Sequence, residues 1–169
     1  MEKSKSPYLK ENDRLSKVIA AIQVMGKYKY YQLNFEKWAY RITGKKNQEK
    51  IWEKIFKEHP EFFRVSAKEK RASLAWRRTY PKRYNVDTEQ KISHAEFKSL
   101  TDEQKKRISR EILTNEDIRT LINTAIDLHA SALKKSQDER WWIHLALPFA
   151  GAILGAFISQ IPAIQSIFS

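Results

Sequence analysis

The segment from Trp141 to Ser169 constrains this chain more than any other feature. It contains no Asp, Glu, Lys or Arg, although the 169-residue chain has a formal net charge of +12. A bilayer core is spanned by roughly 20 predominantly apolar residues in a helix, and the stretch from Trp141 to Ile161 has that length and character. A helix that is apolar on all sides has to be covered by lipid or by protein. We therefore expect a C-terminal transmembrane helix within residues 141–169, with a helix buried in a soluble oligomer as the alternative.

The residues around this segment fit a membrane location. Arg140, Trp141 and Trp142 place a cation and two amphipathic rings where the headgroup layer is expected. Inside the segment, Gly151 and Gly155 are four positions apart, a spacing that lets two membrane helices approach closely. The spacing predicts helix association and hence a homo-oligomer.

The positive charge is concentrated in one part of the chain. Residues 1–95 contain 23 Lys and Arg against 11 Asp and Glu, whereas residues 96–140 contain 9 of each. This distribution predicts a basic head over 1–95, a helical neck or stalk over 96–140, and a membrane segment over 141–169. Because Lys and Arg stay on the cytoplasmic side, we expect a cytoplasmic head, anchored through the C-terminal segment in the cytoplasmic (inner) membrane.

The head is expected to be mainly α-helical with a small β-hairpin. Apolar spacing predicts a helix from about residue 12 to Gly26, and the alternating "KYKYYQL" that follows predicts a short strand. Asn34 and Asn47 are suited to cap a second and a third helix, which end at Gly44 and before Pro60. Two strand-like runs joined by the charged turn "SAKEKR" come next. Their inner side is expected to carry Phe63, Val65, Leu74 and Trp76.

Helix, strand, helix, helix and hairpin, in that order, resemble the winged-helix superfamily over roughly residues 12–80. In that superfamily the third helix usually enters the DNA major groove, and the hairpin, or wing, touches the backbone. The resemblance implies that the basic side chains at the matching positions contact a polyanion. These are Lys46, Lys50, Lys54 and Lys57 at the third helix, Lys68, Lys70 and Arg71 at the wing, and Arg77, Arg78, Lys82 and Arg83 just after it.

The third helix is also compatible with weaker roles. Exposed lysines often serve only solubility, and Glu49, Glu53 and Glu58 share the helix. No Arg or Asn stands at an obvious base-reading position on it, and base edges need such bidentate donors. Accumulated positive charge is sufficient to bind a lipid headgroup or a nucleic-acid backbone, and both stay open.

The neck is expected to be helical. Thr101 with Gln104 forms a capping-box pattern before a short amphipathic helix, and Thr114 is suited to cap a longer one. In the longer helix, the seam Ile118, Leu121, Ala125, Leu128 and Ala132 predicts either a short coiled coil or packing against the head. No Gly or Pro interrupts residues 115–147, so the helix is expected to continue into the apolar segment.

Catalytic chemistry is not expected. The chain has no cysteine, so it has no thiolate metal site, and its four histidines lack metal-ligand spacing. No phosphate-binding loop or nucleophile motif occurs. We therefore predict neither enzyme activity nor a metal or cofactor.

The neck-to-tail junction, "LTNEDIRTLINTAIDLHASALKKSQDERWW" followed by "GAILGAF", resembles membrane effectors of prokaryotic antiviral immunity, including those associated with short Argonaute proteins. The resemblance implies a protein that an Argonaute-type partner activates. It then binds anionic phospholipid, assembles and disrupts the membrane, which kills the cell. Two alternatives remain: a membrane-tethered winged-helix protein that binds DNA, and a membrane adaptor that docks a protein partner.

Overall fold

The computed structural model describes residues 6–66, 68 and 70–138. It divides into two compact units, Met1–His129 and Ala130–Ser169, and the described part of the second unit is the helical stretch 130–138. The described residues form a mainly α-helical protein with two small antiparallel sheets, which agrees with the expected mainly α-helical fold with a small hairpin. No helix among these residues is long and apolar enough to span a membrane. The expected transmembrane helix within 141–169 lies outside the described residues.

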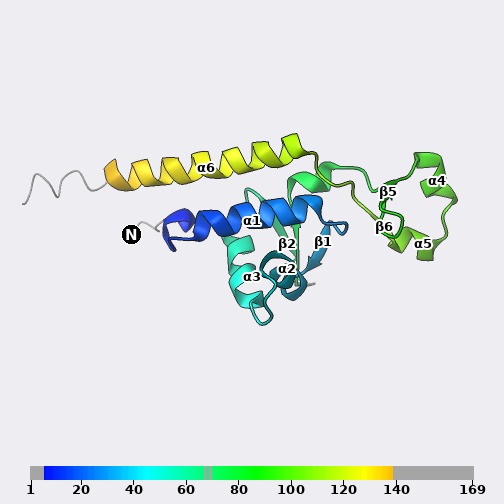
Figure 1. Ribbon diagram of the computed structural model, residues 1–169, viewed down its shortest axis with the longest axis horizontal. Helices are drawn as coiled ribbons and strands as arrows, with labels where there is room; N and C mark the ends of the chain where they lie inside the picture. The colour runs from blue at the N-terminus through cyan, green and yellow to red at the C-terminus, as the bar shows by residue number, and fades with distance from the viewer. Residues whose placement is uncertain (1–5, 67, 69, 139–169) are drawn as a thin grey trace, which may run out of the picture. The chain divides into compact units, whose positions relative to one another are not determined.

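The first half of the chain contains the elements that the apolar spacing predicts (Figure 1). In chain order they are η1 (Pro7–Leu9), α1 (Arg14–Lys27), β1 (Gln32–Asn34), α2 (Phe35–Thr43), α3 (Glu49–Glu58), β2 (Phe63–Ser66), β3 (Arg71–Leu74) and η2 (Trp76–Thr79).

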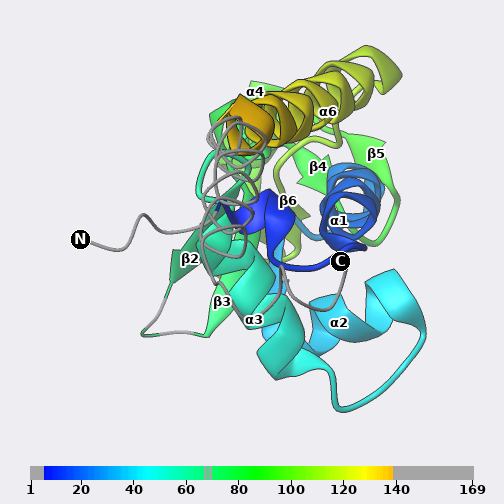
Figure 2. The same cartoon turned by 90° about the vertical axis from the view of Figure 1, so that its left-hand side faces the viewer.

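The first three strands form one antiparallel sheet in the order β1-β3-β2. Phe63 pairs with Leu74 and Ser66 with Arg71 in the hairpin, while Leu33 of β1 pairs with Ala72 of β3. Strand β1 is therefore an edge strand. Figure 2 shows β2 and β3 beside α3, and α1 contacts both α2 and β3.

The core of this region is built from one face of each helix and from β3. Val18, Ile22 and Met25 of α1 are fully buried, as is Trp38 of α2, whose indole N–H donates to the Ala72 carbonyl at 2.9 Å. Helix α3 contributes a buried face of Trp52, Ile55 and Phe56. The spacing of apolar residues predicts these three together with Ile51, which is instead 47% exposed. Burial of an aliphatic or aromatic side chain stabilises by roughly 1.5–3 kcal/mol, so this shared face fixes α3 on the sheet.

The predicted helix ends are right in part. The side chain of Asn34 accepts from the backbone N–H of Lys37, and Gly44 ends α2 in the left-handed conformation. The prediction for Asn47 is wrong, because Asn47 itself adopts a positive φ of 61° and Gln48 occupies the N-cap position without a side-chain cap. Trp76, expected on the inner face of the hairpin, instead begins η2 and is 39% exposed, since β3 ends at Leu74.

A second small sheet lies in the region after the hairpin and is not predicted by the sequence analysis. Its strands have the order β5-β4-β6, and the helices α4 and α5 lie between β5 and β6 in the chain. The elements are β4 (Tyr84–Asn85), β5 (Gln90–Lys91), α4 (His94–Ser99), α5 (Asp102–Lys106) and β6 (Ile108–Ser109). Both helices begin with a capping box, and the one predicted at Thr101 and Gln104 is confirmed. Tyr84 pairs with Ser109, so strand pairing crosses the boundary that we expect between residues 95 and 96.

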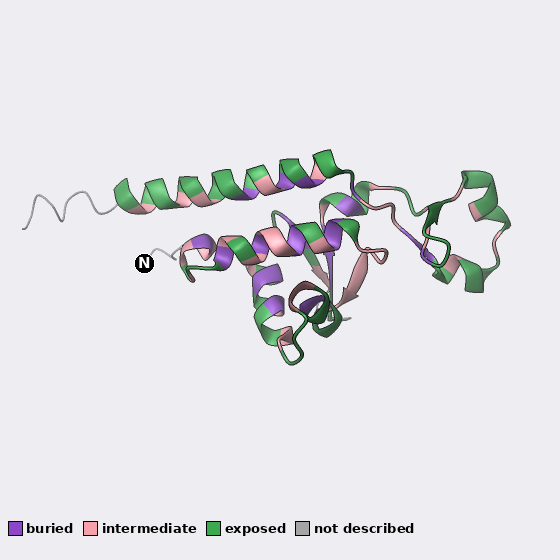
Figure 3. Ribbon diagram, in the orientation of Figure 1, coloured by how far each residue is buried: buried purple, intermediate pink, exposed green. Residues whose placement is uncertain are grey.

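The long helix α6 (Asn115–Asp138) begins where Thr114 predicts. The Thr114 hydroxyl accepts from the Asp117 backbone N–H at 3.1 Å, and the Asp117 carboxylate accepts from the Thr114 N–H at 2.9 Å. Of the predicted seam, Ile118, Leu121 and Ala125 are buried, all in the first half of the helix (Figure 3). A Cβ placed on Gly26 of α1 would lie 3.0 Å from the Ile118 side chain. This part of α6 therefore packs on the head, which is one of the two arrangements that the sequence leaves open.

Candidate functional site

Three of the predicted basic residues lie together on α3. Lys50, Lys54 and Lys57 line a shallow depression of about 410 Å³ with Glu53 and Glu58, and we call this surface the α3 lysine face. Helix α3 carries three lysines and three glutamates, because Glu49 adds to Glu53 and Glu58. The face therefore offers alternating charge rather than a positive surface.

Two of these lysines are already paired. The ammonium of Lys57 lies 2.7 Å from the Glu53 carboxylate one turn away, and that of Lys54 lies 3.3 Å from Glu11. Burial opposes ionisation of Glu11, but hydrogen bonds from Lys17 and Lys54 outweigh it and lower the Glu11 pKa. Lys54 thus serves a contact between α3 and the start of α1.

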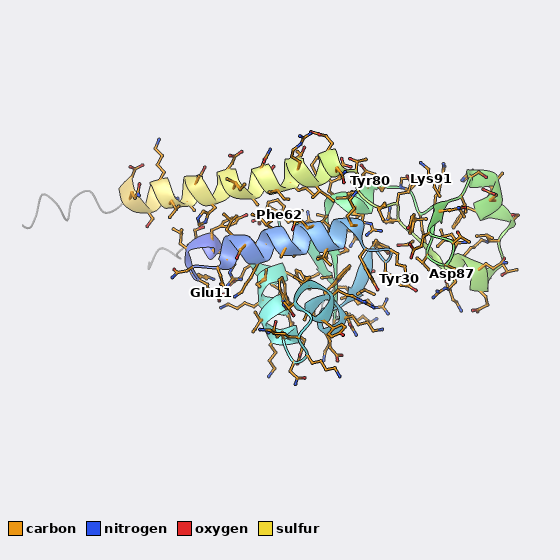
Figure 4. All side chains as sticks on the ribbon, viewed as in Figure 1. Glu11, Tyr30, Phe62, Tyr80, Asp87 and Lys91 are labelled. Carbon is orange, nitrogen blue, oxygen red and sulfur yellow. The ribbon has the colours of Figure 1, made fainter. Side chains whose placement is uncertain are left out.

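The same contact contains a buried arginine. Arg14 is fully buried, with guanidinium nitrogens 2.9 Å from Glu11 and 3.1 Å from Glu58, and Lys10 donates to Glu58 at 2.7 Å. Burial again opposes ionisation of Glu58, but the hydrogen bond from Lys10 and the charge of Arg14 lower its pKa. Figure 4 labels Glu11 at this cluster. The acidic side chains beside the α3 lysines therefore balance structural cations.

The predicted wing cations are exposed. Lys68 and Lys70 lie in the turn between β2 and β3, and Arg71 begins β3. Lys70 has a positive φ of 50°, and its carbonyl accepts from the Phe35 N–H at 3.2 Å, which ties the base of the wing to the start of α2. The wing thus presents cations to solvent beside α2.

Arg77 does not belong to any anion-binding surface, and the prediction for this residue is wrong. Its side chain is fully buried, and its five N–H donors reach five backbone carbonyls. The acceptors are Met25 at 2.8 Å, Tyr28, Lys29 at 3.4 Å, Arg110 at 2.9 Å and Glu111 at 2.9 Å. Burial lowers the pKa of Arg77 to about 10, which leaves the guanidinium charged at neutral pH. Arg77 therefore joins the C-terminal end of α1 to the segment after β6.

The remaining cations of this group differ from Arg77. The adjacent Arg78 is exposed on η2, and Lys82 is exposed in the loop that follows. Arg83 is half-buried, and its carbonyl accepts from the Ile92 N–H at 2.8 Å.

A hollow of about 650 Å³ lies beside α2. It combines three tyrosines with three cations, while Leu33 and Glu36 complete the lining. We call it the tyrosine groove. Its tyrosines are Tyr28, Tyr30 and Tyr40, and its cations are Lys37, Arg41 and Lys46. Lys46 is therefore separated from the other three lysines with which the sequence groups it.

Two buried side chains hold the loop that supplies Tyr28 and Tyr30. The Arg77 guanidinium donates hydrogen bonds to the backbone carbonyls of Tyr28 and Lys29. The Tyr31 N–H donates at 3.0 Å to the hydroxyl of Ser109, a side chain only 4% exposed. Two buried polar side chains thus fix the backbone of residues 28–31.

The rings are also fixed. Tyr28 packs edge-on against Trp38 at 5.8 Å, and the Arg41 guanidinium lies 5.0 Å from the Tyr28 ring centre. Arg107 donates to the Tyr30 hydroxyl at 3.0 Å and is itself paired with Asp87. Figure 4 shows Tyr30 in the loop that follows α1 and Asp87 in the region of the second sheet. The rings of Tyr28 and Tyr30 are therefore held by contacts within the unit Met1–His129.

Two smaller hollows continue from the groove along β1. One, of about 150 Å³, shares Leu33 and Lys37 with the groove and adds Arg71. The other, of about 210 Å³, shares Gln32 and Arg71 with the 150 Å³ hollow and adds Tyr31, Lys82 and Lys106. The edge of β1 thereby brings together Lys46, Arg71 and Lys82, which the sequence analysis places on three separate elements.

Sequence reasoning missed the tyrosine groove. The signal was present in "KYKYYQL", where lysine alternates with tyrosine, but we interpret that alternation as a strand. Only Gln32–Asn34 is strand, and residues 28–31 form a loop. The sequence pattern does not single out Lys37, Tyr40 and Arg41, because the other residues of the groove lie on different elements and meet them only in the folded chain.

The predicted membrane-interface residues Arg140, Trp141 and Trp142, and the helix-association residues Gly151 and Gly155, lie outside the described residues. Within residues 6–66, 68 and 70–138, no group of three or more His, Cys, Asp or Glu is arranged to hold a metal ion. Comparisons with protein-family models, curated proteins and solved structures find no match to this chain.

Proposed function

We propose that this protein is a membrane effector whose basic head binds anionic phospholipid and whose C-terminal segment self-associates in the membrane. The observation that carries the proposal is the change in the sequence at Arg140: the preceding residues hold all of the +12 charge, and the 29 residues from 141 to 169 hold none. A basic head beside an apolar segment is suited to the cytoplasmic face of a membrane, where anionic lipid gathers.

The order of elements in the head supports the proposal that it is winged-helix-like. The order α1-β1-α2-α3-β2-β3 and the sheet order β1-β3-β2 give a compact module with the β2–β3 hairpin as its wing. The exposed wing cations Lys68, Lys70 and Arg71 supply the lipid contacts, together with Arg78 and Lys82. Each basic residue near an anionic surface contributes on the order of 1 kcal/mol.

The C-terminal segment supplies the membrane step. Arg140, Trp141 and Trp142 mark its entry in the sequence, and the Gly151 and Gly155 spacing provides the close-packing face. In this proposal the cell-killing activity belongs to antiviral immunity, and an Argonaute-type partner provides the activating signal.

Dye release from liposomes tests the membrane function. Full-length protein, mixed with its activating partner, should release dye from vesicles that contain anionic lipid and leave neutral vesicles intact. Gly151→Ile with Gly155→Ile should abolish release, because bulky side chains separate the helices, while binding to anionic vesicles is retained. Release that is unchanged in the double variant contradicts assembly through this face.

A second function, DNA binding by a membrane-tethered winged helix, is favoured by the position of α3, which corresponds to the DNA-reading helix of that superfamily. Against it stands the equal number of lysines and glutamates on α3. Replacing Lys68, Lys70 and Arg71 by Gln should reduce the salt dependence of duplex binding if the wing contacts DNA phosphates. An unaltered dependence removes this alternative.

A further inference from the structure

The tyrosine groove places flat aromatic faces beside cations, a combination that neither the wing nor the α3 lysine face has. We propose that this groove binds single-stranded nucleic acid, with a base stacked on Tyr40 and phosphate groups paired with Arg41 and Lys46. Tyr40 is the natural platform because it is 47% exposed on α2. This ligand differs from the lipid of the proposed membrane function, and the inference does not rest on that function, although Arg71 and Lys82 at the end of the track are also among the proposed lipid contacts.

Charge favours a phosphate-bearing ligand. The groove holds three cations and a single acid, Glu36, and the two hollows along β1 add three further cations and no acid. Accumulated positive charge of this kind provides the sequence-independent part of nucleic-acid affinity. The three hollows share lining residues, so together they form one extended track, which suits a chain with a phosphate at each repeat.

The aromatic lining selects among phosphate ligands. An unpaired base offers a free face for stacking, whereas the bases of a duplex are stacked on one another and phospholipid headgroups have no flat ring. The groove volume of about 650 Å³ lies in the range of about 300–1,000 Å³ typical of ligand sites. A concave site of this size admits a splayed base more readily than the convex surface of a double helix.

The groove is formed before any ligand arrives. Buried Arg77 and Ser109 fix the backbone that carries Tyr28 and Tyr31, and Trp38 supports the Tyr28 ring. Binding therefore need not order the loop, which removes a cost that flexible sites have to meet.

Fluorescence anisotropy with full-length protein in neutral detergent tests the proposal. The probes are labelled single strands of about 12 nucleotides, oligo-dT and oligo-U, and a duplex of the same length. We expect the single strands to bind more tightly than the duplex at the same salt. Tyr40→Ala should weaken single-strand binding about 5- to 100-fold, because loss of one stacked base commonly has that effect. Tyr40→Phe should restore it, since the ring is retained.

Ile51→Ala is the matched control, because Ile51 is also 47% exposed but lies on α3 outside the groove. It should bind single strands like the wild type. Equal affinities of Tyr40→Ala and Ile51→Ala overturn the proposal, and so does a duplex that binds as tightly as the single strands. Anionic vesicles form a second arm: Tyr40→Ala should bind them normally. A parallel loss of vesicle binding identifies a general anion site and overturns the single-strand assignment, whereas failure of dye release alone leaves it standing.

Discussion

The α3 lysine face and the tyrosine groove each present three cations, yet they are different physical objects. On α3, Lys57 pairs with Glu53 of the same helix at 2.7 Å, and Lys54 pairs with Glu11 at 3.3 Å. In the groove, the Arg41 cation lies over a tyrosine ring, and Glu36 is the one acid in the lining. The comparison teaches that the identity of the neighbours decides what a lysine-rich surface can bind.

The difference has a cause in the fold. Lys57 shares its helix with its counter-charge, so this pair forms locally at a spacing of four residues, whereas Lys54 pairs with Glu11 before α1. The groove instead collects residues from the α1–β1 loop, from α2 and from the loop before α3. Its residues meet only in the folded head.

The strongest test removes the support of the groove. Arg77→Ala leaves five backbone carbonyls without their donor, and a buried unsatisfied polar group commonly costs about 1–3 kcal/mol. The free energy of unfolding should fall by at least 3 kcal/mol on this basis, as measured by chemical denaturation. Arg78→Ala is the matched control, because the Arg78 side chain is adjacent in sequence but exposed. This variant should change the free energy of unfolding by less than about 0.5 kcal/mol. Similar effects of the two variants contradict the role given to Arg77.

Charge removal compares the two surfaces directly. One variant replaces Lys37, Arg41 and Lys46 by Gln, and the other replaces Lys50, Lys54 and Lys57, so both lower the net charge from +12 to +9. Single-strand binding contributes a slope of about −0.7 per phosphate contact to the logarithmic salt dependence. The groove variant should therefore reduce the slope by about 1.4, for the two phosphates paired with Arg41 and Lys46, and the α3 variant should leave it almost unchanged. The contrast fails if the two variants shift the slope equally.

The acids near α3 predict a pH dependence. Because the folded-state pKa of Glu58 lies below its ordinary value of 4.5, its contribution to stability is present above pH 4.5 and is lost as the pH falls through the lower folded value. Glu58→Gln should cost about 1–3 kcal/mol at pH 7, because buried Arg14 loses a carboxylate partner. It should also flatten the decline in acid, followed by denaturation from pH 7 to pH 3. Glu53→Gln, which affects only the exposed pair with Lys57, is the control, and an equally flat profile for it contradicts the assignment.

The smallest effect concerns Lys57. Its pair with Glu53 spans one helical turn at the surface, and such pairs contribute about 0.2–0.5 kcal/mol. Lys57→Ala should lower stability by no more than this, and raising the salt concentration should erase the difference. A loss of several-fold in polyanion affinity in the same variant would show that α3 does take part in binding.

Much of the head could be predicted from local patterns. The spacing of Trp52, Ile55 and Phe56 identifies the buried face of α3, and Asn34 and Gly44 mark the ends of α2. These features depend on residues within one turn of each other, so a linear pattern contains them. The second sheet was not predicted because its strands have only two residues each and because β4 pairs with β6 across more than twenty positions.

The site was harder to predict for a related reason. Arg77 and Arg78 are adjacent and identical in the sequence, but one is buried under five carbonyls and the other is exposed. Nothing in the local sequence separates them, because the carbonyls come from residues 25–29 and 110–111. The grouping of Lys46 with the α3 lysines failed for the same reason, since the turn at Gly44 to Asn47 directs it toward α2.

The contacts below the tyrosine loop also have a consequence for the order of folding. Tyr31 and Ser109 are 78 positions apart, and Arg77 reaches back 52 positions to Met25 and forward 34 to Glu111. Contacts of such long range form late, because closing long loops costs chain entropy before it is rewarded. During synthesis the helices of the head can collapse as they emerge, whereas the loop gains its support only after residue 111 has left the ribosome. The head should therefore mature in two stages, with its core first and its aromatic surface second.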